Sequence, residues 1–219
     1  MISQNINMGL DSLVEEAVVE AIKNYLDKKE PPNTSNYLDL IFPAERYTHS
    51  IMTGLLTSLG TTLWEKISKK IAAHNNFEVL DEKKFNKNTK KGEGIDLWVK
   101  KENREYMYDI KTVLLNAGSG VKNSQNLDSW RHYRLLECPD VDLSTSIVFP
   151  YNPYPSYEIY LKKEKGKIAP LILGETALLG DQFWNFIFGK DDSMNLIFEV
   201  LRKIGASNKL DHLKKKFYR

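Results

Sequence analysis

Two short strand-like runs around a polar turn constrain the fold of this chain more than any other feature. The runs are Ile95–Val99 and Tyr106–Val113, and Lys100–Glu105 lies between them. Apolar, β-branched and aromatic residues in runs of this length are typical of β-strands, and a short polar connection between two such runs predicts a β-hairpin.

The predicted hairpin brings three ionisable residues together. Residues two apart on a strand project from the same face, so Asp109 and Lys111 point the same way while Ile110 turns into the core. The turn brings Asp96, at the start of the neighbouring strand, toward Asp109. The spacing therefore predicts a polar cluster at one end of an apolar hairpin.

Two carboxylates held close together repel each other unless a cation lies between them. Carboxylate oxygens suit Mg²⁺, and water and substrate phosphate fill its remaining positions. Such an ion polarises a phosphate and lowers the pKa of a bound water, and a nearby lysine orients that water. The alternative interpretation of Asp96, Asp109 and Lys111 is a surface salt bridge on a solvated hairpin.

Helical patterns flank this central region. Strands in the middle of a chain with helices at both ends predict an α/β fold, with a mixed central β-sheet flanked by helices. We expect one domain over residues 1–219, with a core at about 55–161 and helical additions at 1–30 and 181–219. The predicted helices are Asp11–Lys28, Ile51 or Leu55 to His74, Leu127–Leu136, Asp181–Phe188, Ser193–Ile204 and Leu210–Tyr218, and the further strands are Phe77–Leu80, Ser146–Phe149 and Tyr157–Leu161.

The composition indicates the cellular compartment more clearly than the function. A single cysteine, Cys138, excludes an internal disulfide, and no leader or membrane-spanning apolar run is seen, so we expect a cytoplasmic protein without a membrane partner. The net charge of +2 is too small to establish a polyanionic ligand.

The spacing of the polar cluster resembles a known signature. Asp96, twelve intervening residues and then Asp109-Ile110-Lys111 resemble the D…(D/E)xK pattern of the PD-(D/E)xK nuclease superfamily, although Gly94-Ile95 stands where the superfamily usually has proline. The resemblance implies a restriction-endonuclease-like core. It also implies that Asp96, Asp109 and the Ile110 carbonyl bind Mg²⁺ and that Lys111 positions the attacking water.

Two flanking segments resemble type II restriction endonucleases. Ser58–Glu65 is similar to the helix that precedes their catalytic hairpin, which implies that Glu65 supports a ligand or a second metal; a helix ion pair with Lys69 is the alternative. Val148–Tyr154 is similar to a segment of the TdeIII-type enzymes and implies a GGNCC-like site.

The segment after the second strand supplies candidate DNA contacts. Gly118–Gly120 is predicted to be a connector, since it lacks the features of a phosphate-binding loop. Short donors suited to phosphates or base edges follow it, and two arginines three positions apart share one helix face. The predicted DNA-binding residues are Lys122, Asn123, Ser124, Gln125, Arg131 and Arg134, with a solvent-facing role as the alternative.

The resemblance as a whole implies a type II restriction endonuclease that cuts double-stranded DNA at a short palindromic site. Palindromic sites favour two-fold symmetric proteins, so we expect a homodimer, with a cognate methyltransferase in the same system. The alternatives are a structure-selective repair or resolvase-type nuclease and an inert DNA-binding protein of the same fold.

Overall fold

The computed structural model describes residues 2–27, 62–82, 85, 94–111, 117–151, 171–207 and 211. Contacts within the chain divide it into two compact units, one formed by Met1–Ile67 with Leu196–Arg219 and the other by Ser68–Asn195. The single domain expected over residues 1–219 stays a prediction.

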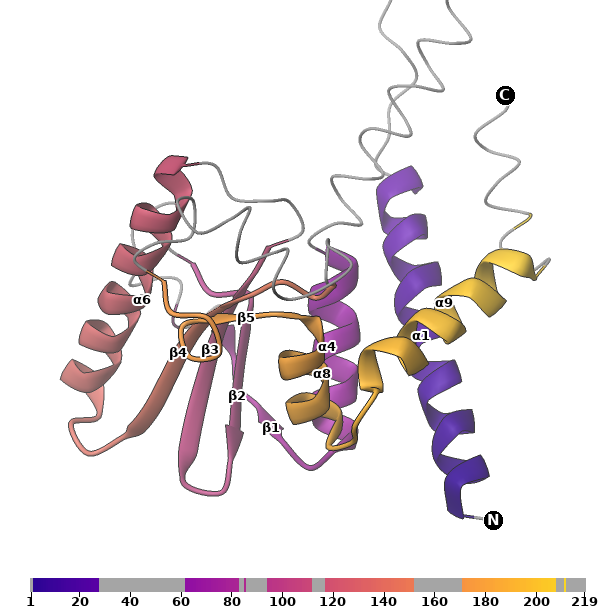
Figure 1. Cartoon of the computed structure of the whole chain (residues 1–219), viewed down its shortest axis with the longest axis horizontal. Coiled ribbons are helices and arrows are strands. Elements are labelled where there is room, and N and C mark those ends of the chain that lie inside the picture. The colour runs from indigo at the N-terminus through magenta and orange to yellow at the C-terminus, as the bar shows by residue number, and fades with distance from the viewer. Residues whose placement is uncertain are drawn as a thin grey trace, which may run out of the picture. The chain divides into compact units, whose positions relative to one another are not determined.

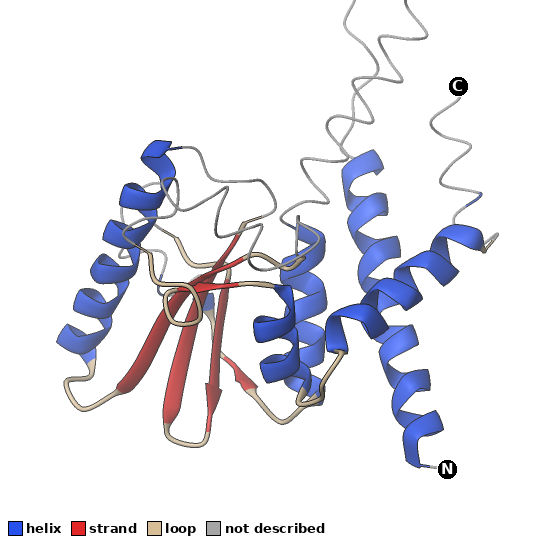
Figure 2. Cartoon of the chain, in the orientation of Figure 1, coloured by secondary structure: helices blue, strands red, loops and turns tan. Residues whose placement is uncertain are grey.

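The described part of the first unit is helical (Figure 2). It contains α1 (Ile2–Asp27), the start of α4 (Trp64–His74) and most of α9 (Ser193–Ala206). Helix α1 begins nine residues before the predicted start. It buries the stripe expected from its three- and four-residue spacing, and that stripe consists of Leu10, Val14, Ala17, Val18, Ala21 and Ile22.

The second unit is built on a mixed five-stranded sheet (Figure 1). Strands β1 and β2, and β2 and β3, pair antiparallel, whereas β3 and β4, and β4 and β5, pair parallel. Helix α6 (Ala117–Glu137) connects β3 to β4, because parallel neighbours need a crossover connection. The strands are β1 (Glu78–Val79), β2 (Leu97–Lys101), β3 (Arg104–Ile110), β4 (Asp142–Val148) and β5 (Ala177–Leu178). The predicted α/β class and mixed central sheet are confirmed.

Alternating residues of the strands face different helices. On one face, sheet residues such as Trp98, Met107 and Ile147 form a buried cluster with Leu127 and Trp130 of α6. On the other face, the rings of Tyr108 and Tyr106 lie 5.3 and 4.8 Å from those of two phenylalanines of α8 (Gly180–Phe188), Phe183 and Phe186. Helices therefore pack on both faces of the sheet.

Helix α6 begins ten residues before the predicted start at Leu127. The prediction that Gly118–Gly120 forms a connector is wrong, because these residues lie in the first turn of α6. The reason is tertiary: Gly120, Asn123, Leu127 and Trp130 are all buried on one stripe, and packing outweighs the unfavourable helix propensity of glycine, about 1 kcal/mol per residue.

Other boundaries also differ from the sequence patterns. Strand β4 starts at Asp142, four residues before the predicted strand, and the two-residue strand β5 was not predicted. The predicted strand Tyr157–Leu161 lies outside the described residues, as do most of the predicted helix Leu210–Tyr218 and the segment 51–61.

Among the helices that the structure describes, none has both the length and the apolar character needed to cross a membrane.

Candidate active site

The start of β2 is bent in a way that places the Asp96 side chain at the end of β3. Leu97 is the ladder partner of Tyr108, yet the backbone N–H of Asp96 also donates to the Tyr108 carbonyl at 2.9 Å. Two residues of one strand facing one residue of the other is the pattern of a β-bulge, which interrupts the ladder and redirects a side chain. The sequence predicted a regular hairpin at this point, so the bend is a new finding.

The redirected side chain completes the hydrogen bonding of β3. The Ile110 backbone N–H, beyond the last ladder pair of the hairpin, donates to Oδ2 of Asp96 at 2.8 Å. This bond fixes the Asp96 carboxylate beside the backbone that links Asp109 and Lys111. The predicted meeting of the three residues at one end of the hairpin therefore occurs in the structure.

Asp109 and Lys111 form an ion pair on the same strand end. Nζ of Lys111 lies 2.6 Å from Oδ2 of Asp109. The Asp109 side chain is 6 % exposed and that of Lys111 is 30 % exposed. The Lys111 backbone N–H donates to the Val148 carbonyl at 2.8 Å, so β4 fixes the backbone while the ammonium group reaches solvent.

The donor set fits a hard divalent cation. Within a strand the N–H and C=O of one residue point to the same neighbour, so the Ile110 carbonyl lies on the Asp96 side. Mg²⁺ needs only one or two carboxylates, because water and phosphate complete its octahedron. Within the described ranges, no group of three or more His, Cys, Asp or Glu side chains suited to a metal gathers, and a site of two carboxylates with water and phosphate does not need one.

The other predicted site residues lie on two helices. Glu65 lies in the first turn of α4, within the first compact unit, and its part in the site stays a prediction. On α6, Lys122 and Gln125 are exposed, Ser124 is half-buried and Asn123 is 5 % exposed. Arg131 is also exposed.

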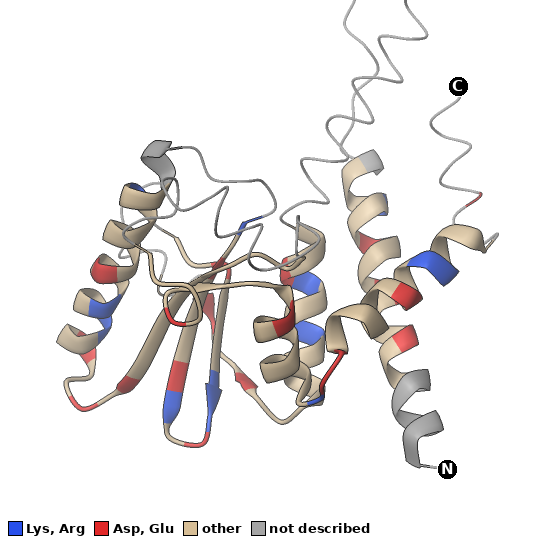
Figure 3. Ribbon diagram, in the orientation of Figure 1, with Lys and Arg blue, Asp and Glu red and all other residues tan. Residues whose placement is uncertain are grey.

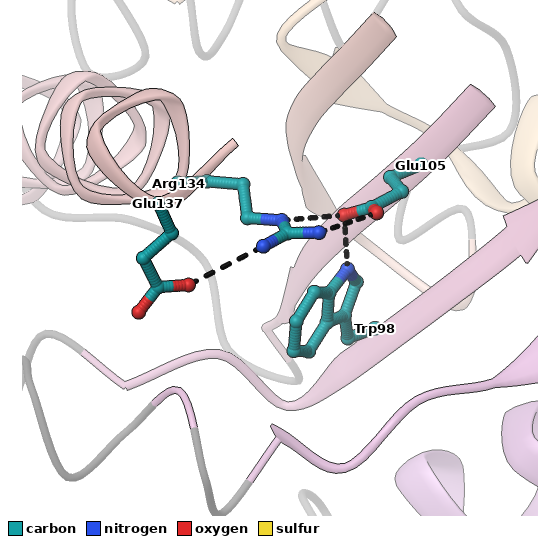
Figure 4. A network of polar contacts seen from close by, with 4 residues as sticks. All are labelled: Trp98, Glu105, Arg134 and Glu137. Carbon is teal, nitrogen blue, oxygen red and sulfur yellow. Dashed lines mark hydrogen bonds and ion pairs between the residues drawn. The ribbon is translucent and has the colours of Figure 1, made fainter. Parts of the chain in front are cut away.

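Arg134 of α6 binds the sheet (Figure 4). Its Nε and Nη2 donate to Oε2 and Oε1 of Glu105 at 2.9 and 2.8 Å, and its Nη1 lies 3.3 Å from Oε2 of Glu137. The indole N–H of Trp98 also donates to Oε2 of Glu105 at 3.0 Å, and the guanidinium lies 5.2 Å from the Trp98 ring centroid. A contact between Arg134 and a DNA phosphate would have to replace Glu105.

This network explains a buried acid that the sequence assigned to a turn. Glu105 is 4 % exposed and lies on β3 at the same parity as Met107 and Asp109, which was the signal available in the sequence. Burial alone would raise the pKa of the Glu105 carboxyl, but the hydrogen bonds and charge of Arg134 outweigh burial and hold that pKa below its usual value. The bond to Glu105 in turn raises the pKa of Arg134.

Charged residues thus occupy both ends of the β2–β3 hairpin, with uncharged residues between them (Figure 3). The end near the turn holds the network of Glu105 and Arg134. The opposite end holds Asp96, Asp109 and Lys111.

The cavity in the second unit does not coincide with the carboxylates. It has a volume of about 770 Å³, and its wall includes Tyr106, Tyr108, Ser144 and Ser146. These residues alternate with Asp109 and Ile147 along β3 and β4, so they point from the opposite face of the sheet. The cavity and the cluster of Asp96, Asp109 and Lys111 are therefore separate features of the second unit.

Comparison with known proteins adds independent information. The family model described as type II restriction endonuclease HinfI matches residues 73–205, more than half of the chain, which include Asp96, Asp109, Lys111 and all of α6 but not Glu65. A stretch of 116 residues is 22% identical to the type II restriction enzyme MjaII of Methanocaldococcus jannaschii. That stretch is 50% of this chain but only 31% of the length of MjaII. The resemblance to the TdeIII-type enzymes is not confirmed.

Proposed function

The chain belongs to the HinfI family of type II restriction endonucleases, and from this premise we propose that it hydrolyses phosphodiester bonds of double-stranded DNA at a specific short site, with Mg²⁺ as cofactor. The observation that carries the proposal is the convergence of Asp96, Asp109 and Lys111 on the Ile110 backbone. A salt bridge on a solvated hairpin, the alternative from the sequence, would not require a buried Asp109 or a second carboxylate fixed beside it.

The three side chains divide the chemistry between them. Asp96 and Asp109, with the Ile110 carbonyl, would hold the cation, which when bound polarises the scissile phosphate and makes hydroxide available near neutral pH. The Ile110 N–H keeps the Asp96 carboxylate in its orientation, so little reorganisation is needed on binding. Lys111 is partly exposed and would orient the attacking water while offsetting the repulsion between the carboxylates.

The remaining parts of the proposal concern DNA and partners. Lys122, Ser124, Gln125 and Arg131 would contact phosphates or bases from α6, on which all but Ser124 are exposed. Glu65 would support a ligand or a second metal. A homodimer would cut both strands of a palindromic site, and a methyltransferase would protect the host DNA. The GGNCC-like site stays a prediction, because the matching family is HinfI.

The test is digestion of plasmid DNA by the purified full chain, with Mg²⁺ and with excess chelator. We expect discrete bands with Mg²⁺ and intact plasmid with chelator. A smear, or cutting of branched DNA alone, would mean a repair or resolvase-type nuclease instead, and binding without cutting would mean an inert DNA-binding protein.

The site assignment has its own control. Asp109→Ala and Lys111→Ala are expected to abolish the bands while the protein stays folded. The assignment is wrong if both variants cut the plasmid as fast as the parent.

A further inference from the structure

One residue of α6 has a buried amide nitrogen without a hydrogen-bond partner among the described residues. Asn123 is 5 % exposed, and within the described structure its Nδ2 has no hydrogen-bond partner. Buried polar groups are nearly always hydrogen-bonded, because removing an amide from water without a new partner is unfavourable. An exception of this kind requires an explanation.

The orientation of Asn123 follows from the periodicity of α6. Asn123, Leu127, Trp130 and Arg134 are spaced by four, three and four residues, which places them on one stripe of the helix. Leu127 and Trp130 belong to the cluster buried against the sheet, and Arg134 binds Glu105 of β3. The Asn123 side chain therefore faces the same side of the sheet as Glu105 and Asp109.

The height of Asn123 along the sheet follows from the contact between Arg134 and Glu105. Helix α6 returns from the end of β3 to the start of β4, so it runs antiparallel to both strands (Figure 1). Asn123 lies eleven residues before Arg134, or about 16 Å along the helix axis. Asp109 and Lys111 lie four and six residues after Glu105, or about 13 and 20 Å along the strand. With ideal rises along helix and strand, Asn123 comes to about the height of the ion pair of Asp109 and Lys111.

We propose that Asn123 is a further residue of the active site, whose Nδ2 donates a hydrogen bond to a non-bridging oxygen of the scissile phosphate. The inference rests on the nuclease function proposed above and adds a residue to its substrate contacts. The acceptor must come from outside the described protein, because no protein acceptor there reaches Nδ2. A water bound to a cation donates its lone pair to the metal, so a phosphate oxygen is the better acceptor.

The proposed role of Asn123 differs from the roles of its neighbours on α6. Lys122 and Gln125 are exposed and suit contacts with the DNA backbone outside the cutting site. Asn123 is buried on the stripe of α6 that packs against the face of the sheet carrying Asp109, so its donor would act where charge develops on the phosphate.

The test pairs Asn123→Leu with Asn126→Leu. Asn126 is also a buried amide of α6, 6 % exposed, but it takes part in an interaction within the protein. In metal-free protein without DNA, Asn123→Leu should melt at or above the temperature of the parent, because it removes a donor without a partner, whereas Asn126→Leu should melt lower. With Mg²⁺ and saturating plasmid, Asn123→Leu should cut on the order of 10²-fold more slowly than the parent, and folded Asn126→Leu should cut at the parent's rate.

The outcomes separate this inference from the function on which it rests. A parent protein that does not cut DNA with Mg²⁺ overturns both. A parent that cuts, together with an Asn123→Leu variant that cuts equally fast, overturns the inference alone. A melting temperature of metal-free Asn123→Leu that is lowered as much as that of Asn126→Leu also overturns it, because the Asn123 side chain would then serve the fold as Asn126 does.

Discussion

The two ends of β3 carry the same kind of group in different surroundings. Glu105 at the start and Asp109 near the end are each 4 % exposed and lie on the same face of the sheet. Both oxygens of Glu105 accept hydrogen bonds from Arg134, and Trp98 adds a third bond. Asp109 pairs with a lysine that reaches solvent, and a second carboxylate is fixed nearby.

Burial alone therefore does not tell a structural carboxylate from a functional one. What differs is how much of the group's bonding capacity the protein itself satisfies. A buried carboxylate with its partners inside the protein becomes costly to the fold when one partner is removed, whereas one beside another carboxylate and a partly exposed cation can take up a metal and a substrate. Substitutions at the two ends should separate these roles.

The largest expected effect is on catalysis, at the end of β3 that carries Asp109. Asp109→Asn keeps the shape of the side chain but removes the charge that we propose binds the metal, so the rate of plasmid cleavage with Mg²⁺ should fall by at least about 10³-fold. The melting temperature should change little. The control is Asp142→Asn, since Asp142 is exposed and pairs with Arg104 at 3.4 Å; it should alter neither quantity. Equal rates of cleavage by the two variants would contradict a functional role for Asp109.

The next effect is on stability, at the start of β3, where Glu105 pairs with Arg134. Arg134→Ala leaves the buried Glu105 without its cation, so the free energy of unfolding should fall by about 3 kcal/mol. Thermal or urea unfolding measures this loss. Arg131→Ala, on the same helix but exposed, should change stability by no more than about 0.5 kcal/mol. If Arg134→Ala unfolds like the parent, the network does not hold α6 to the sheet.

The smallest effect is on the pH dependence of stability. Because Arg134 holds the folded pKa of Glu105 below its ordinary value of 4.5, the folded state binds fewer protons than the unfolded state in that range. The stabilisation is present above pH 4.5 and is lost as the pH falls through the folded pKa. Glu105→Gln has no ionisable carboxyl and lacks this pH-dependent stabilisation. The difference in melting temperature between parent and variant should therefore narrow from pH 7 to pH 4. A gap that widens in acid would contradict the lowered pKa.

The sequence predicted the features that depend on local spacing. The hairpin, the meeting of Asp96 with Asp109 and Lys111, and the mixed sheet follow from strand patterns within a short segment. The pairing of Glu105 with Arg134 joins residues 29 positions apart, and local patterns carry no information about such a contact. The early start of α6 was missed because glycine argues against a helix, and the bend at Asp96 was missed because a bulge leaves the hydrophobic pattern unchanged.

The closeness of Asp96 and Asp109 in the chain also bears on the order of assembly. They are thirteen residues apart, whereas Glu105 and Arg134 are separated by 29. By chain-closure entropy, bringing the carboxylates together costs about 0.7 kcal/mol less than forming the pair between strand and helix. Asp96 and Asp109 can therefore meet as soon as one hairpin closes, before α6 docks, so the proposed metal site needs only the hairpin for its two carboxylates.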